Sequence, residues 1–445
     1  MPTTSILRDM GDNLIIRSAT AADSEALAEF NSVIHTEEPG QPDLRIAAWT
    51  KDLLLKPHPT FNPGDFTIVE DTATGKIVSS LNLISQTWAY AGIPFKVGRP
   101  ELVGTLAEYR HRGLVRAQFE IIHQWSAERG ELVQAITGIP YYYRLFGYEM
   151  GLNLSGGRAG YLPTIPELAQ DTEEPFIIRP AQPADLPFIA EIDLYGNQRS
   201  LISCLRTKAE WLYELEGRSP DNVNRNEIRV IENKSHEPVG FIVHSTKRWS
   251  RMMSVSWYEL KRGVSWAEVT PSVIRYIRQT GLVTPPEYGQ DEFAMFGFWL
   301  GEKHPVYDVI PDRLPRIRPP YAWYVRVPDL PAFLWKIAPV LENRLANSNI
   351  TGYSGEIRLT FYRSGVQLKF EQGKLTAAAP YKPTPFGHSG DAAFPDLTFL
   401  HLLFGHRSLD ELKYAFADCS TENEETSVLL NTLFPRSPSR IWPVS

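Results

Sequence analysis

The stretch Arg110-His111-Arg112-Gly113-Leu114-Val115-Arg116 follows an apolar run, Leu102-Val103-Gly104-Thr105-Leu106, and precedes a helical pattern at residues 117–125. We therefore predict a strand, a tight turn and the N-terminus of a helix. The free N–H groups and the dipole at that end favour an anion, whereas arginines there cost about 0.3–1 kcal/mol each without one. Gly113 lets the backbone approach such an anion closely. An anion-binding loop and a solvated basic turn are the two interpretations.

An internal repeat is the second feature. Residues 15–29 return as residues 177–191, with eight of the fifteen positions identical and no gap. Each copy predicts a short strand, a turn and a helix whose N-cap is Asp23 or Asp185. We interpret the repeat as a duplicated domain; a chance match of a short segment is the alternative.

Proline-rich stretches mark two joins, near residues 156–175 and 305–331. After the second join, residues 333–345 predict an amphipathic helix with a kink at Pro339. Strands in an antiparallel meander and two further helical patterns follow, at residues 356–362, 366–371, 374–376, 399–404 and 409–416. The sequence therefore predicts three domains, at residues 1–160, 161–328 and 329–445.

The basic loop resembles the coenzyme A pyrophosphate loop of the GNAT acetyltransferase superfamily, Arg-x-x-Gly-x-[Gly/Ala]. Arg110, Gly113 and Val115 occupy the motif positions, and Val115 departs from the usual Gly or Ala. The order of the three predicted domains resembles the Eis (enhanced intracellular survival) acetyltransferases. This resemblance implies a mixed fold class: two tandem GNAT acyltransferase folds, which are α/β, followed by a sterol-carrier-protein-like α+β domain.

The resemblance also implies where acetyl-coenzyme A binds. In GNAT folds the pantetheine arm pairs with a splayed strand, which maps onto Leu102, Val103, Gly104 and Thr105. The pyrophosphate then lies on the loop and the helix start. The implied pyrophosphate contacts are Arg110, His111, Arg112, Gly113, Leu114, Val115 and Arg116.

Tyr143 is the candidate acid. It lies in Tyr141-Tyr142-Tyr143-Arg144-Leu145-Phe146-Gly147-Tyr148, which resembles the superfamily signature Phe-Tyr-Arg-x-x-Gly-Phe. In that signature the Tyr hydroxyl faces the coenzyme sulfur. A phenol suits this role because it stays protonated at neutral pH and still donates to a forming thiolate. Packing in an aromatic core is the alternative for Tyr143.

Two groups compete for the role of base. In Eis enzymes the C-terminal carboxylate enters the first active site, and the matching group here is the α-carboxylate of Ser445. Trp442 and Pro443 give this tail an apolar means of docking, although Ser445 is not aromatic as the Eis ending is. Glu101, just before the coenzyme strand, is the rival base, and a disordered tail is the remaining alternative.

Acceptor contacts are expected in the loop after the first helix, where GNAT enzymes hold their acceptors. His35, Glu37 and Glu38 lie there, and Trp88 and Tyr90 are candidates for an aromatic wall against a cation. A solvated acidic loop is the commoner explanation of two adjacent glutamates.

The second copy of the repeat does not keep the loop chemistry. Leu260 stands three residues before Gly263, where Arg or Gln is expected. We therefore predict that the second domain has the fold but no coenzyme site.

Composition excludes several other classes of protein. The net charge of −7 argues against nucleic acid as a partner, and no apolar run reaches the ~18 residues that span a membrane. The N-terminus lacks a signal-peptide pattern. The two cysteines and ten histidines show no disulfide or metal spacing. A cytoplasmic protein that needs no metal is the expectation.

The sequence thus predicts an acetyl-coenzyme A-dependent N-acetyltransferase. Its acceptor would be a small-molecule amine, such as an aminoglycoside or a polyamine, or a lysine side chain. The Eis resemblance implies a homo-oligomer, with a hexamer as the family's assembly. The alternatives are a non-catalytic protein that binds coenzyme A or an apolar ligand, and an acyltransferase for longer chains.

Overall fold

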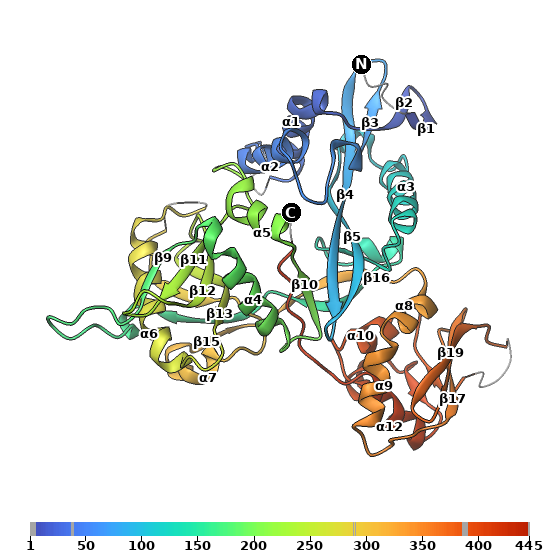
Figure 1. The fold of residues 1–445 in the computed structure, drawn as a ribbon. Coiled ribbons are helices and arrows are strands. Elements are labelled where there is room, and N and C mark those ends of the chain that lie inside the picture. The colour runs from blue at the N-terminus through green and yellow to red at the C-terminus, as the bar shows by residue number, and fades with distance from the viewer. Residues whose placement is uncertain (1–5, 37–39, 288, 290, 385–389, 444–445) are drawn as a thin grey trace.

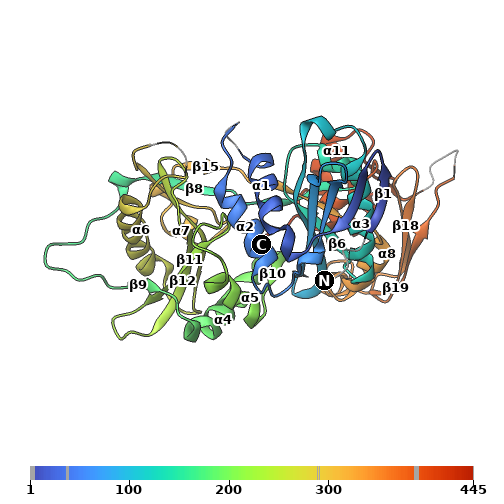
Figure 2. The same cartoon turned by 90° about the horizontal axis from the view of Figure 1, so that it is seen from above.

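The computed structural model describes residues 6–36, 40–287, 289, 291–384 and 390–443. These residues form three β-sheets with helices packed on them (Figure 1). In Figure 1 the first sheet lies at the upper centre, the second on the left and the third at the lower right. Figure 2, seen from above, shows the second sheet on one side of the first and the third on the other.

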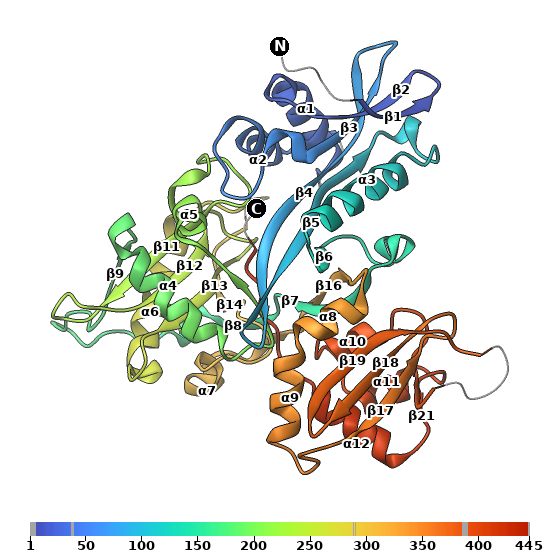
Figure 3. The same ribbon diagram turned by 45° about the vertical axis from the view of Figure 1, so that its right-hand side comes forward.

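Nine strands make up the first sheet within the described residues. In spatial order they are β1 (Ile6–Gly11), β2 (Leu14–Ser18), β3 (Phe66–Asp71), β4 (Lys76–Tyr90), β5 (Ile93–Thr105), β6 (Val133–Ile136), β16 (Tyr321–Arg326) and β7 (Glu149–Leu154), with β10 (Ile202–Leu205) pairing to β4. Strands β4 and β5 form a long antiparallel hairpin that extends toward both other sheets (Figure 3).

The other two sheets are smaller, with seven and five strands in the part of the chain that is described. The second runs β15 (Arg316–Arg318), β8 (Gly157–Tyr161), β14 (Met295–Phe298), β13 (Met252–Leu260), β12 (Pro238–Ser245), β11 (Asn226–Glu232) and β9 (Ile177–Pro180). The third runs β19 (Lys374–Tyr381), β18 (Gly365–Glu371), β17 (Gly355–Thr360), β20 (Ala392–Ala393) and β21 (Ser420–Thr421).

The helices follow the same division. The first sheet carries α1 (Ser24–Ile34), α2 (Leu44–Leu55) and α3 (Leu114–Glu128), and the second carries α4 (Leu186–Asn197), α5 (Lys208–Leu212), α6 (Trp266–Val283) and α7 (Val306–Val309). The third carries α8 (Leu330–Lys336), α9 (Ala338–Ala346), α10 (Phe399–Leu403), α11 (Leu409–Ala415) and α12 (Glu424–Leu433). Among the described residues, no helix is both long enough and apolar enough to span a membrane.

The first two sheets exchange strands. Strand β8 follows β7 directly in the chain but pairs with β14 and β15 in the second sheet. Strand β16 follows β15 directly but lies between β6 and β7 in the first sheet. Pairing therefore crosses the predicted boundary at residue 160, whereas no strand pair of the described residues crosses residue 328. The division of the chain into domains stays a prediction.

The repeat is reproduced in three dimensions. β2 leads through a 3₁₀ turn into α1, and β9 leads through another into α4. In the first copy, Arg17 donates to Asp23 at 2.7 Å; in the second, Arg179 donates to Asp185 at the same distance. Asp23 and Asp185 do precede their helices, but their carboxylates bind these arginines and the turn instead of capping helix N–H groups. The predicted N-cap positions are therefore confirmed, whereas neither carboxylate makes a capping hydrogen bond to its helix.

The third unit matches its predicted pattern closely. Its first helix breaks at Ile337 into α8 and α9, beside the predicted kink at Pro339, and β17, β18 and β19 form the predicted antiparallel meander. Its core is continuous with the first sheet: Phe333 packs edge-on against Phe95 with 5.3 Å between ring centroids.

Candidate active site

A cleft opens where two strands of the first sheet separate. β5 and β6 are parallel and pair only at Val97–Val133 and Gly98–Gln134. Beyond Gly98, no strand of the described chain pairs with this edge of β5. A bulge in the β4–β5 pairing accompanies the separation, and Leu102 takes a left-handed conformation with φ of +52°. Since a branched residue there is strained, the bulge is a specific feature of this strand.

The cleft has a volume of about 820 Å³. It brings together, from the predicted site, His35, Glu101, Leu102, Val103, Gly104, Thr105, Arg110, His111, Gly113, Leu114, Val115, Arg116 and Tyr143. Arg112 is not part of the lining; its guanidinium carbon lies 5.0 Å from the ring centroid of Tyr109. The open edge of β5, the basic loop and the tyrosine turn therefore face one space.

The basic loop forms one end of this cleft. Gly113 precedes α3 with φ of +75°, and His111 also has a positive φ, of +64°. No described atom lies within 4 Å of the point where a Cβ on Gly113 would stand. Val115 is half-buried and packs against the aromatic cluster around Phe119, although it also borders the cleft. The free N–H groups at the start of α3 are therefore accessible to an anion.

Tyr143 lies in the 3₁₀ turn Tyr142–Phe146 and is 6% exposed. Its ring packs edge-on against Tyr324, 5.4 Å between centroids, and lies against Gly138, where a Cβ would stand 2.4 Å from the ring. Burial raises the pKa of the Tyr143 hydroxyl above its usual value, and Glu101 adds to this. The hydroxyl is therefore protonated at neutral pH and available as a donor in the cleft.

Glu101 is half-buried and forms an ion pair with the buried Arg99. Burial raises the pKa of the Glu101 carboxyl, while the Arg99 charge acts in the opposite direction. The Arg99 guanidinium also lies over the Trp323 ring, 4.9 Å from its centroid. Trp323 lies in the exchanged strand β16, so that strand contributes to the packing around the Arg99–Glu101 ion pair.

His35 is the C-cap of α1 and borders the cleft beside Gly104, where a Cβ would stand 3.6 Å from its Nε2 atom. Burial lowers the pKa of His35 to about 4. A hydrogen bond with the Leu102 backbone raises the pKa, but its effect is smaller. The ring is therefore neutral at pH 7. Its Nε2 atom is buried and has no hydrogen-bond partner among the described residues, and the same holds for Nε1 of Trp49 on α2. Both residues border the cleft.

A family profile and solved structures relate this chain to known proteins. The sequence profile of the acetyltransferase (GNAT) domain matches residues 16–151. That span runs from β2 to β7 and includes the whole cleft. Residues 16–151 form a GNAT acetyltransferase domain. No curated protein matches the chain in sequence.

Solved structures resemble the chain over almost its full length. A probable N-acyltransferase of unknown function from Enterococcus faecalis is 14% identical, with 96% of this chain and 97% of that chain covered and a TM-score of 0.65. A GCN5-related N-acetyltransferase from Anabaena variabilis is 15% identical, with 96% and 98% covered and a TM-score of 0.62. Eis1 from Mycobacterium abscessus is 13% identical, with 97% and 99% covered and a TM-score of 0.57.

These likenesses confirm the predicted fold class, a mixed α/β protein with GNAT-like folds. The prediction of a GNAT-type enzyme is likewise confirmed. The likeness of the third unit to a sterol carrier protein stays a prediction.

Two residues predicted to contact the acceptor, Trp88 and Tyr90, do not line the cleft. Trp88 and Tyr90 are fully buried in the core that the domain shares with the third unit. The Trp88 indole donates to Gln86 at 2.9 Å, and the Tyr90 hydroxyl donates to the Leu403 carbonyl at 2.8 Å. The predicted aromatic wall is therefore wrong, because these rings join domains instead of facing a substrate. Glu37, Glu38 and Ser445 lie outside the described residues.

Sequence reasoning missed Arg99, His35's neutral state and the bulge at Leu102. The spacing of Arg99 and Glu101 could have predicted their ion pair, since residues two apart in a strand share a face. No local pattern marks the bulge, which depends on the pairing with β4.

Proposed function

We propose that the chain is an acetyl-coenzyme A-dependent N-acetyltransferase that transfers acetyl to an amine. The observation that carries the proposal is the single cleft in which the open edge of β5, the N-terminus of α3 and the Tyr143 hydroxyl meet. GNAT domains generally use acetyl-coenzyme A, which supplies the acetyl group as a thioester.

The lining of the cleft suits the co-substrate. An extended arm with amide groups gains main-chain hydrogen bonds from an unpaired strand edge, which β5 offers beyond Gly98. A pyrophosphate gains charge-assisted hydrogen bonds at the start of α3, where Arg110 and Arg116 border the cleft. Val115 borders this space, but part of its side chain packs into the aromatic cluster.

The reaction needs two proton transfers. As the amine nitrogen bonds to the thioester carbonyl carbon and the carbon–sulfur bond breaks, a base removes the amine proton and an acid protonates the thiolate. Tyr143 is assigned as the acid, because burial keeps its hydroxyl protonated and the residue borders the cleft. After transfer the tyrosine recovers its proton from solvent.

Two bases remain in this proposal. Glu101 borders the cleft, and burial raises the pKa of its carboxyl, which favours proton uptake. The Ser445 carboxylate is the second, supported by the course of the tail up to Pro443, which is described below. Besides these two bases, the neutral His35 ring offers an acceptor for an amine N–H through Nε2, which has no partner among the described residues.

The acceptor is assigned only as an amine; aminoglycosides, polyamines and lysine side chains are the classes to test. Release of thiol from acetyl-coenzyme A, measured across these classes, tests the proposal. Turnover with any amine above the rate of hydrolysis supports it, and coenzyme binding without turnover refutes it. Repeating the assay with longer acyl groups tests the alternative of a long-chain acyltransferase.

A binding protein for an apolar ligand is the second candidate. The third unit contains a cavity of about 500 Å³, bordered by Leu330, Phe361 and Phe399 among others. Tight binding of an apolar ligand without thiol release would favour this function.

We further propose that the protein is a cytoplasmic homo-oligomer that requires no metal. Sedimentation tests the assembly, and metal analysis tests the metal requirement.

A further inference from the structure

The second sheet contains a counterpart of the first cleft, and it is filled. β13 and β14 are parallel and pair from Met252–Met295 to Val255–Phe298, and then they separate as β5 and β6 do. A pocket between the end of α4, residues 300–304 after β14 and the C-terminal tail has a volume of only about 10 Å³, against about 820 Å³ for the first cleft. Three of the residues that border it, Pro438, Ser439 and Arg440, belong to the C-terminal tail.

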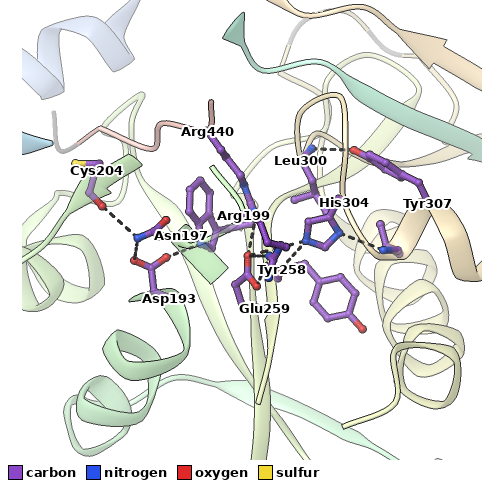
Figure 4. A network of polar contacts seen from close by, with 12 residues as sticks. Asp193, Asn197, Arg199, Cys204, Tyr258, Glu259, Leu300, His304, Tyr307 and Arg440 are labelled. Carbon is purple, nitrogen blue, oxygen red and sulfur yellow. Dashed lines mark hydrogen bonds and ion pairs between the residues drawn. The ribbon is translucent and has the colours of Figure 1, made fainter. Parts of the chain in front are cut away.

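Side chains occupy the strand edge that a coenzyme arm would need. The His304 Nε2 atom lies 3.0 Å from the Tyr258 carbonyl of β13, and the Val306 N–H donates to His304 Nδ1 at 3.3 Å. The Tyr307 hydroxyl donates to the Phe298 carbonyl at 3.0 Å. Figure 4 shows this network, with Arg440 entering it from the tail.

Glu259 is the centre of the network. It is 1% exposed and accepts hydrogen bonds from Arg199, at 2.6 Å, and from Arg440, at 2.8 Å. The Arg440 guanidinium carbon also lies 3.6 Å from the centroid of the Trp257 ring. Gly196 permits this arrangement, since a Cβ there would stand 2.3 Å from the Glu259 carboxyl carbon. A buried carboxylate with two guanidinium partners holds its ligands in a fixed geometry.

The tail continues from this anchor along the junction of the two sheets. Leu201 N–H donates to the Pro438 carbonyl and Arg440 N–H donates to the Ile202 carbonyl, so the tail runs parallel to β10. The Trp442 ring packs between Trp211 and Trp257, at centroid distances of 5.6 and 5.3 Å. The Arg206 guanidinium carbon lies 4.0 Å from the centroid of the Trp442 ring.

The direction of the tail is significant. β10 pairs antiparallel with β4, from Ile202–Tyr90 to Leu205–Thr87. The tail therefore runs in the direction in which β4 leads from Tyr90 back toward Asn82, which pairs with Glu101 at the cleft. The described part of the tail, which ends at Pro443, is therefore directed along the first sheet toward the first cleft.

We propose that the second domain has become an anchor for the C-terminal tail, and that Glu259 and Arg440 position the tail for acetyl transfer in the first cleft. In this arrangement the Glu259–Arg440 pair occupies the space that would accept a second coenzyme. The packing of Trp442 between Trp211 and Trp257 then fixes the tail two residues further on. The catalytic part of the inference rests on the proposed function.

The primary test is a double-mutant cycle. We compare thiol release by the wild type, Arg440→Met, a deletion of residues 442–445 and the combination. If Arg440 acts through the tail, Arg440→Met lowers kcat roughly 10-fold or more with the KM for acetyl-coenzyme A unchanged, and adding it to the deletion causes no further loss. Losses that multiply would overturn the inference, because Arg440 would then act independently of the tail.

A second measurement does not depend on turnover. Carboxypeptidase digestion of the full chain, followed by mass spectrometry, gives the rate at which Trp442 is released. Loss of a charge-assisted hydrogen bond should accelerate release roughly 10- to 100-fold in Arg440→Met and in Glu259→Gln. Glu174→Gln is the matched control, since Glu174 binds the buried Arg275 through two oxygens in the same domain but away from the tail.

The two readouts separate the possible failures. Trimming at the wild-type rate in both anchor variants refutes the anchor, whatever the activity. Faster trimming in a protein that turns over no amine supports the anchor and refutes the proposed function. Faster trimming with unchanged kcat refutes the catalytic role of the tail position.

Discussion

Strands β5 and β13 hold corresponding places in their sheets, yet only β5 borders an open cleft. The orders β2-β3-β4-β5-β6 and β9-β11-β12-β13-β14 correspond strand by strand. The first copy has a bulge at Leu102 and a positive-φ glycine before a helix with arginines nearby. The second has Leu260 in place of an arginine, and His304 and Tyr307 on its backbone. A duplicated backbone thus makes the cleft possible, whereas a few side chains determine whether it is open.

The largest expected effect tests the chemistry that the first copy alone is proposed to perform. Tyr143→Phe should lower kcat roughly 10²–10⁴-fold, the range for a lost general acid. Affinity for acetyl-coenzyme A should not change, since removal of one hydroxyl leaves the strand edge and the loop N–H groups in place. Steady-state thiol release and calorimetry measure the two quantities.

Tyr142→Phe is the control for this substitution, because Tyr142 also borders the cleft and packs on the same aromatic cluster. Equal losses in both variants would show that Tyr143 contributes packing and that water protonates the thiolate.

A matched pair of glycines tests the coenzyme loop. Gly113 and Gly263 have φ values of +75° and +86°, and no described atom lies within 4 Å of a Cβ on either. Replacing either with Val strains a left-handed backbone by about 1–2 kcal/mol. Only Gly113→Val should weaken coenzyme binding, by roughly 10- to 100-fold, as a distorted loop loses a charge-assisted phosphate contact. Wild-type affinity in Gly113→Val, measured by calorimetry, would contradict the assignment of the loop.

The filled copy should respond to acid through His304. Burial holds the pKa of His304 well below its usual value, so the folded state keeps the ring neutral. Its stabilising effect is complete above the unfolded pKa of about 6.5, and it is lost as the pH falls below that value. The expected loss in free energy of unfolding is about 1.4 kcal/mol per pH unit for one such group.

Urea unfolding between pH 7.5 and 5.5 measures this slope. His304→Asn should reduce it, whereas a slope equal to that of the wild type would mean that other buried groups determine the acid response.

The smallest expected effect concerns the stoichiometry of coenzyme binding, which is one per chain if the second cleft is filled and two if it is open. With His304 and Arg440 in the second cleft, we expect one coenzyme bound per chain by equilibrium dialysis. A stoichiometry of two would show that the second cleft opens in solution and would remove the basis for the comparison.

Local signals predicted much of this molecule. The strand, turn and helix around Gly113 form as the sequence indicated, with β5 ending at Thr105 and α3 starting at Leu114. The repeat and the meander also formed, because alternation and turn residues act over a few positions. Helix α12 was not predicted, although Asn423 caps it and its apolar residues recur at helical spacing.

Contacts between distant segments could not be predicted. Tyr90 contacts Phe333 of the third unit, and its hydroxyl donates to a carbonyl 313 positions away. Trp88 packs against Trp323 of β16, which is also distant in sequence. The tail's partner in the second domain, Glu259, lies 181 positions before Arg440 and carries no motif. None of these pairings leaves a period or a spacing in the sequence, so only the folded chain reveals them.

The exchange of β8 and β16 has a consequence for how the protein is made. When a ribosome has released residues 1–160, β6 and β7 are complete, but β16, the strand that joins them, is still about 160 residues from synthesis. Until then both strands have unpaired edges, the feature that invites aggregation. The GNAT domain expressed alone should therefore be insoluble, and its nascent form should depend on chaperones. Supplying β16 by fusing residues 316–328 to such a fragment should restore a soluble fold.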